Sequence, residues 1–140
     1  MGKYSRLIDS LNATGKHNPV VYRVLIRADG RAIRPLVRAL LEHCDEEVRH
    51  EIAHVLAERG DPKAIPFLIE AMADPDLYVR QDSAWAIEKI CRMQSGALYD
   101  WLDLEADPDV AQAGIAENKR KVEVWWKANK RFLEHNELLR

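Results

Sequence analysis

The chain has 140 residues, 21 of them Lys or Arg and 23 Asp or Glu, which gives a formal net charge of −2. This length predicts one domain, and the balanced, interspersed charges argue against nucleic acid and anionic membranes as partners. Because the sequence has no apolar run of membrane-spanning length and no signal-peptide core, we expect a cytoplasmic protein in which Cys44 and Cys91 are reduced thiols.

A degenerate helical hairpin is predicted at the N-terminal end, over residues 5–30. Its first helix carries Leu7, Ile8 and Leu11, and a Gly-Lys-His-Asn-Pro turn separates this helix from the apolar segment 20–26. The hairpin matches the repeats that follow only weakly. Such divergence is expected of a unit that covers the open end of a stack.

Two copies of one helical hairpin follow, over residues 31–61 and 62–92. In the first helix of each copy, apolar residues recur at i, i+3, i+4 and i+7, which places them on one helical face. These residues are Ile33, Leu36, Val37 and Leu40 and, 32 positions later, Ile65, Leu68, Ile69 and Met72. Because one such hairpin cannot bury its own apolar face, the repetition predicts an all-α, right-handed solenoid of about three to four stacked hairpins with capped ends.

The second helix of each copy has a matching apolar stripe. It consists of Val48, Ile52, Val55 and Leu56 and, 31 positions later, Val79, Ser83, Ala86 and Ile87. Between the two copies, Gly60 is predicted to form a left-handed helix C-cap, and Pro62 prevents the helix from continuing. Pro35 and Pro66 lie in the first turn of the first helices, where a missing N–H group is harmless.

Charged residues also recur at the start of both second helices. Asp45 precedes Arg49 by four residues, and Asp76 precedes Arg80 by the same spacing. Stacked at a constant offset, these residues predict a ladder of helix caps and ion pairs that orients each turn on its helix. We assign this ladder a structural role.

The repeat resembles the HEAT family, and most closely its short bacterial-type subclass, the phycobilisome-lyase-like HEAT repeat. The resemblance covers residues 31–91 and rests on Ala64-Ile65-Pro66-x-Leu68-Ile69, followed by Asp74-Pro75-Asp76-x-x-Val79-Arg80 and a helix rich in small residues. Membership implies an α-solenoid used for contacts between proteins, and in some members for holding a chromophore or a metal. It implies no particular reaction.

A third, eroded repeat is predicted over residues 96–118. A shift of the second copy by 33 positions places Leu98, Trp101 and Leu102 in the stripe of the first helix and repeats the Asp-Pro-Asp motif at 107–109. Beyond this point the match fails.

The C-terminal segment, residues 119–140, is predicted to be a charged capping helix. It carries the adjacent Trp125 and Trp126, and we favour an interpretation in which these rings cover the last hairpin. A platform for peptide or nucleic acid is the alternative.

Residues 50–54 read His-Glu-Ile-Ala-His, the H-E-x-x-H pattern of zinc metalloproteases. His50 and His54 could share one Zn²⁺, with Glu51 polarising a metal-bound water. The segment lies in register within a helix of the repeat, however, and no third ligand follows at the spacing of the longer motif. Glu70 belongs to the next helix and is expected to face away. We therefore predict no metal or other cofactor, and retain His50 and His54 as candidate ligands of a weak mononuclear site.

The Arg49-His50-Glu51 segment also resembles the His-Glu signature of deoxyhypusine hydroxylase, a HEAT-repeat enzyme with a di-iron site. The resemblance implies that His-Glu pairs from different repeats converge on the metals. Here the equivalent position of the second repeat reads Arg80-Gln81-Asp82. Because one His-Glu pair cannot supply a di-metal site, a metal-dependent hydrolase or hydroxylase ranks third among the predicted functions.

The remaining interpretation treats the same residues as a binding face. In HEAT-like stacks the second helices line the concave surface, and Trp85 is expected beside His54 on this surface. An exposed aromatic ring next to polar groups is typical of an interface anchor, and packing of Trp85 on a neighbouring helix is the alternative. The predicted contact residues are His50, Glu51, His54, Gln81, Asp82, Trp85 and Glu88.

The sequence therefore predicts a non-catalytic adaptor that binds another protein or a peptide on its concave face. The second interpretation is a helper of the lyase or chaperone type that acts on a chromophore protein, and it rests on the type of repeat alone. The oligomeric state is left open.

Overall fold

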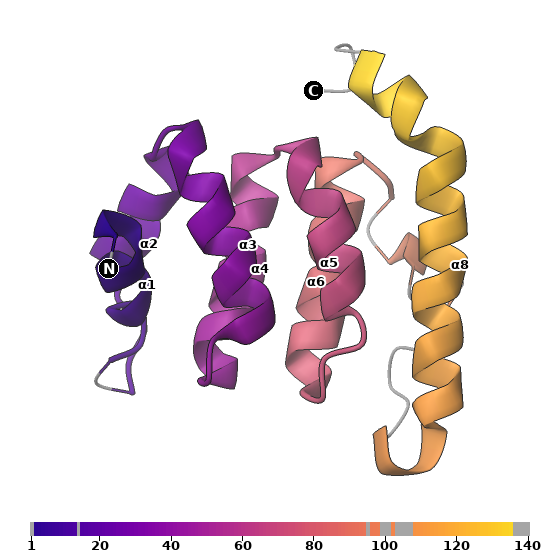
Figure 1. Cartoon of the computed structure of the whole chain (residues 1–140), viewed down its shortest axis with the longest axis horizontal. Coiled ribbons are helices and arrows are strands. Elements are labelled where there is room, and N and C mark those ends of the chain that lie inside the picture. The colour runs from indigo at the N-terminus through magenta and orange to yellow at the C-terminus, as the bar shows by residue number, and fades with distance from the viewer. Residues whose placement is uncertain (1, 14, 95, 99–101, 103–107, 136–140) are drawn as a thin grey trace.

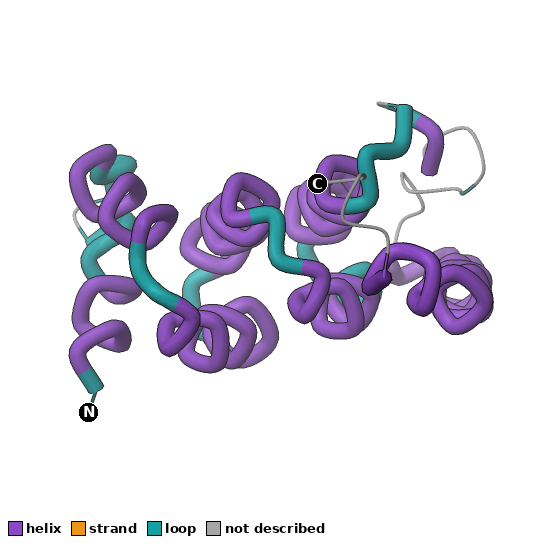
Figure 2. Tube along the Cα trace, turned by 90° about the horizontal axis from the view of Figure 1, so that it is seen from above, coloured by secondary structure: helices purple, strands orange, loops and turns teal. Residues whose placement is uncertain are grey.

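The helices of the computed structural model lie in two layers (Figure 1). One layer contains α1 (Lys3–Asp9), α3 (Ile33–Glu42), α5 (Ile65–Ala71) and α8 (Pro108–His135), and the other contains α2 (Pro19–Arg27), α4 (Glu46–Arg59) and α6 (Leu77–Ile90). The structure describes residues 2–13, 15–94, 96–98, 102 and 108–135. Figure 2 shows the stack from above, and the arrangement confirms the predicted all-α solenoid of helical hairpins.

A short 3-10 helix leads into the first helix of each repeat. η1 (Gly30–Ala32) precedes α3, and η2 (Pro62–Ala64) precedes α5. The carboxylates of Asp29 and Asp61 cap these turns by accepting a hydrogen bond from the N–H group two residues later, at 3.0 and 2.9 Å. Gly60 adopts the left-handed conformation predicted for the C-cap of α4, with a φ of 69°.

The apolar stripes of the repeats form the core between the two layers. The buried stripe residues are Leu36, Val37 and Leu40 of α3, Val48, Ile52, Val55 and Leu56 of α4, Ile65, Leu68, Ile69 and Met72 in and just after α5, and Val79, Ser83, Ala86 and Ile87 of α6. Ile33 is partly buried against the same core. The core predicted from the repeat is confirmed, because each stripe loses its apolar surface to the neighbouring helices.

The N-terminal hairpin is shorter than the repeats but packs on the same core. Ile8 and Leu11 are buried there, together with Leu25 of α2. Arg59, at the end of α4, donates hydrogen bonds to the carbonyl oxygens of Leu25, at 2.8 Å, and Ala28, at 2.6 Å. Since the last carbonyls of a helix have no partner within the helix, α4 caps the C-terminal end of α2.

The charged ladder differs in part from the prediction. Asp45 and Asp76 accept hydrogen bonds from backbone N–H groups in the first turns of α4 and α6, so the predicted caps are confirmed. The expected ion pair between Asp45 and Arg49 is wrong, because Arg49 instead pairs with Asp74 in the turn before α6, at 2.9 and 3.1 Å. The buried Arg80 donates a hydrogen bond to the carbonyl oxygen of Asp74 at 2.9 Å.

α8 lies at the C-terminal end of the first layer, where it packs on α5. It runs without a break through position 118, so the expected division between a repeat ending at 118 and a cap beginning at 119 falls within one helix. Val122 and Trp126 are buried, and Trp125 is partly buried against the core. These positions agree with the interpretation of the tail as a cap on the last hairpin.

The described part of the predicted third stripe also joins the core. Leu98 and Leu102 are buried, whereas Trp101 lies outside the described residues. Within the described part of the chain, no helix combines the length and the apolar character that a membrane span requires.

Candidate functional site

The outer surface of α4 and α6 carries two rows of polar and aromatic side chains. The row on α4 is Glu47, His50, His54 and Glu58, and the row on α6 is Tyr78, Asp82, Trp85 and Lys89. Spacings of three and four residues place each row on one side of its helix. We call this surface the α4–α6 face. It shares His50, His54, Asp82 and Trp85 with the predicted contact residues, and its rows meet at offsets of 31 or 32 residues.

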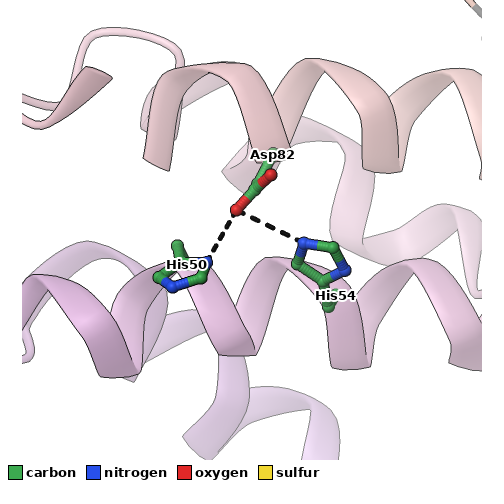
Figure 3. A group of neighbouring side chains, drawn as sticks. All are labelled: His50, His54 and Asp82. Atoms are coloured by element: carbon green, nitrogen blue, oxygen red, sulfur yellow. Dashed lines mark hydrogen bonds and ion pairs between the residues drawn. The ribbon is translucent and has the colours of Figure 1, made fainter. Parts of the chain in front are cut away.

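His50, His54 and Asp82 form the centre of the α4–α6 face (Figure 3). Nδ1 of His50 lies 2.8 Å from Oδ2 of Asp82, and Nε2 of His54 lies 3.3 Å from the same oxygen. One ligand-type atom of each of the three residues lies within 4.8 Å of the other two. The repeat offset of 31 residues pairs Asp82 with Glu51, but in the structure the carboxylate of Asp82 points between the two histidines (Figure 3).

The charges of this cluster depend on one another. The hydrogen bond to Asp82 raises the pKa of His50 to about 9 against the opposing effect of burial, and Glu47, 2.9 Å from Nε2, acts in the same direction. Burial would raise the pKa of Asp82, but its hydrogen bonds and charge interactions with His50 and His54 outweigh burial and lower the pKa. At neutral pH, an ion pair between imidazolium and carboxylate therefore joins α4 to α6.

Trp85 lies beside His54, as the repeat offset predicted, but its ring is only partly exposed. The two ring centroids are 4.7 Å apart, with 36° between the ring planes. Nζ of Lys89 lies 5.2 Å from the centroid of the indole ring and also pairs with Glu58 of α4. Trp85 packs on the core and on His54 of α4. Much of its surface is therefore used for packing, as the alternative interpretation of this residue expected.

Two of the predicted contact residues, Glu51 and Glu88, are buried, so the expectation that they face solvent is wrong. Glu51 is 8% exposed, and its carboxylate pairs with His17 in the turn before α2. Glu88 is 3% exposed and accepts hydrogen bonds from the N–H groups of Gly96, at 3.2 Å, and Leu98, at 2.7 Å. These partners replace the lost hydration of each carboxylate, so both residues anchor neighbouring segments of the chain.

A cavity of about 460 Å³ adjoins the cluster, between the N-terminal hairpin and α4. Its lining includes His17, Tyr22, Glu51 and His54. The rings of His17 and Tyr22 meet edge to face with centroids 5.3 Å apart. Burial raises the pKa of Tyr22, and the negative charges of Glu58 and Glu51 act in the same direction. The phenol is therefore neutral, and the cavity extends the α4–α6 face toward α2.

Sequence reasoning missed the third ligand-type group and the most exposed aromatic residue of this surface. Asp82 is the third ligand-type group beside the two histidines. Glu70, the residue considered for this role from the sequence, lies in the other layer and pairs with Lys119 of α8 at 3.6 Å. Tyr78 is 64% exposed. Tyr78 could have been included in the predicted binding face, because it lies one helical turn before Asp82. Gln81, another predicted contact residue, is partly buried on α6.

Comparisons with known proteins agree with the repeat architecture. A curated relative, deoxyhypusine hydroxylase of Drosophila melanogaster, is 31% identical over 97 residues, which cover 69% of this chain and 32% of the relative. The chain thus spans about a third of the length of that relative. No solved structure gives a significant match. A family model of HEAT repeats matches residues 13–88 and 33–117 without distinguishing the phycobilisome-lyase-like subclass, which stays a prediction. The chain belongs to the HEAT-repeat family.

Proposed function

We propose that this HEAT-repeat chain is a non-catalytic scaffold that binds a protein or peptide partner through the α4–α6 face. The observation that carries the proposal is the position of Tyr78. This residue is 64% exposed and lies in the same row as the partly buried Trp85 and the charged Asp82. Protein interfaces are enriched in Tyr and Trp, which offer a large contact area together with a polar group.

The surroundings of Tyr78 support the same function. The paired rows of α4 and α6 hold each other through the contacts of His50 with Asp82, at 2.8 Å, and of His54 with Trp85. Side chains that are ordered before binding lose little conformational entropy when a partner binds. The adjoining cavity of about 460 Å³ offers a recess for a partner side chain next to His54.

Position-specific crosslinking tests this proposal. A photo-crosslinking phenylalanine analogue is placed at position 78 on α6 or, as the matched control, at position 67 on α5, in the chain expressed in its source cells. Phe67 is also an exposed aromatic residue, 37% exposed, but it belongs to the other layer. We expect a discrete adduct from position 78 and none from position 67, and mass spectrometry identifies the crosslinked protein.

The identified partner is then purified, and its affinity is measured for wild type, Tyr78→Ala and Phe67→Ala. We expect Tyr78→Ala to weaken binding by about tenfold or more, as for an aromatic anchor, and Phe67→Ala to leave it unchanged. Tyr78→Ala is a cleaner variant than Trp85→Ala, because Trp85 also packs on the core. An adduct that forms equally from both positions, or an affinity that does not respond to Tyr78→Ala, would contradict the proposal.

A further inference from the structure

We infer that His50 and His54 of α4, together with Asp82 of α6, form a binding site for a single divalent transition-metal ion of the zinc type. The inference goes beyond partner binding, because it assigns an inorganic ligand to the centre of the α4–α6 face. It also differs from the sequence pattern, since the third ligand comes from the next repeat. Two imidazoles and one carboxylate favour Zn²⁺ and similar ions over Mg²⁺ and Ca²⁺, which prefer oxygen ligands.

The two distances from Asp82 to the histidines are close to those of this coordination. In a tetrahedral zinc site with bonds of about 2.0–2.1 Å, neighbouring ligand atoms are roughly 3.3 Å apart. Nε2 of His54 and Oδ2 of Asp82 are 3.3 Å apart. Nδ1 of His50 lies 2.8 Å from the same oxygen, so this contact has to widen by only about half an ångström to admit the metal.

The neighbours of the three ligands hold them in suitable orientations. The second ring nitrogen of His50, Nε2, lies 2.9 Å from the carboxylate of Glu47, an arrangement that is common for metal-binding histidines. The ring of His54 lies against the indole of Trp85, with centroids 4.7 Å apart. Both histidines project from the same side of α4, because their spacing is one helical turn.

This arrangement is not that of the metalloproteases that share the H-E-x-x-H pattern. In those enzymes the Glu of the motif acts on a metal-bound water. Here the corresponding Glu51 is buried and pairs with His17, on the side of α4 toward α2. The metal would therefore link two successive repeats without a catalytic Glu beside it. Unlike a closed structural zinc site, it has only three protein ligands, which leave the fourth position open to water or to a partner side chain.

Metal titration of the full, untagged chain after treatment with a chelator tests the inference. Zn²⁺ affinity is measured by competition with a chromophoric chelator, and Co²⁺ is used as a spectroscopic probe of the coordination geometry. We expect one Zn²⁺ per chain, a visible Co²⁺ spectrum of the tetrahedral type, and no comparable binding of Mg²⁺. Zn²⁺ should also raise the Tm, because the ion binds only the folded arrangement.

Variants of the ligands and of a matched histidine complete the experiment. His54→Ala and Asp82→Asn should each weaken Zn²⁺ binding by at least about tenfold, and Glu47→Gln, which removes the carboxylate beside His50, should weaken it by a similar factor. The control is His43→Ala. His43 also lies beside a carboxylate, that of Asp9 at 2.9 Å, but is not part of the cluster. This variant should bind Zn²⁺ like wild type.

Three results would overturn the inference: wild type that binds no stoichiometric Zn²⁺, a Co²⁺ spectrum that stays octahedral, or Zn²⁺ affinity that is the same in Asp82→Asn and wild type. Circular dichroism of each variant checks that the helices are intact. If Asp82→Asn does not fold, X-ray absorption spectroscopy of the Zn²⁺-bound wild type decides. Two imidazoles and a carboxylate oxygen around the ion support the site, and any other set of protein ligands contradicts it.

Discussion

Arg49 of α4 forms a two-point ion pair with Asp74, a residue of the turn that leads into α6 of the next repeat. Nε and Nη2 of the guanidinium donate to the two carboxylate oxygens at 2.9 and 3.1 Å, and both side chains are mostly buried. The third nitrogen, Nη1, donates to the carbonyl oxygen of His43 at 2.7 Å. One side chain thus joins the turn of its own repeat to the turn of the following repeat.

Replacement of Asp74 tests how much this ion pair contributes to the free energy of unfolding. Asp74→Ala leaves the mostly buried guanidinium of Arg49 without its anion, and it also removes the acceptor for the N–H of Asp76, at 2.9 Å. We expect the free energy of unfolding to fall by about 3 kcal/mol or more, measured by urea denaturation. The control is Arg31→Ala, whose ion pair is solvent-exposed, with an Arg side chain 88% accessible. That variant should lose far less stability, because solvent screens an exposed pair, and equal losses in the two variants would contradict the assignment.

Gly60 provides a test of the linker between the repeats. Its φ of 69° strains any residue with a Cβ atom, although no atom lies within 4 Å of the position that such an atom would occupy. Gly60→Ala should therefore lower the free energy of unfolding by about 1–2 kcal/mol through backbone strain alone. Gly30→Ala is the matched control, because Gly30 precedes the first repeat, has equal space and no such φ. If both variants have the stability of wild type, the left-handed cap is not required.

The ion pair between His50 and Asp82 predicts a dependence of stability on pH in the chelator-treated chain. The folded state raises the pKa of His50 from 6.5 to about 9, chiefly through the hydrogen bond to Asp82. The contribution of His50 to stability is thus complete below about pH 6.5 and is lost as the pH rises through about 9. We expect the difference in Tm between wild type and His50→Gln to shrink over this range. A difference that stays constant from pH 6 to pH 9.5 would show that His50 does not titrate in this way.

The two cysteines should differ strongly in reactivity. Cys44 is exposed, whereas Cys91 is buried, and burial raises the pKa of its thiol to about 12. Because the thiolate is the reactive form, a chromogenic disulfide reagent at about pH 8 should label Cys44 rapidly and Cys91 only after unfolding. The Cys44→Ser variant isolates the slow reaction. Rapid labelling of native Cys44→Ser would contradict the burial of Cys91.

The fold could be predicted almost completely from the sequence, because its signals are local and repeated. The stripes that include Leu36 of α3 and Ile52 of α4 recur one repeat later, and all of the residues concerned are buried except Ile33, which is partly so. Gly60 and the capping aspartates marked the helix ends correctly. The predicted boundary between a repeat ending at 118 and a cap beginning at 119 differs from the structure, because α8 continues through this position. Neither Gly nor Pro stands at 118 or 119 to end a helix.

The candidate site could be predicted only in part. The repeat offset correctly placed Trp85 beside His54, but a helical wheel describes one helix and contains no information on what covers it. Glu51 and Glu88 are therefore buried against His17 and the segment after α6, two partners that the repeat pattern does not contain.

Within the two repeats, the sequence was sufficient to predict which residues form helices, where those helices end and which sides of them meet in the core. These features follow from spacing along the chain, which is the same in every copy of the repeat. Two features became known only from the contacts between helices: Asp82 completes a cluster with His50 and His54, and Arg49 pairs with Asp74 rather than Asp45. The physical reason is that both arrangements depend on the separation and rotation of neighbouring helices, which the packing of the whole core sets to within an ångström.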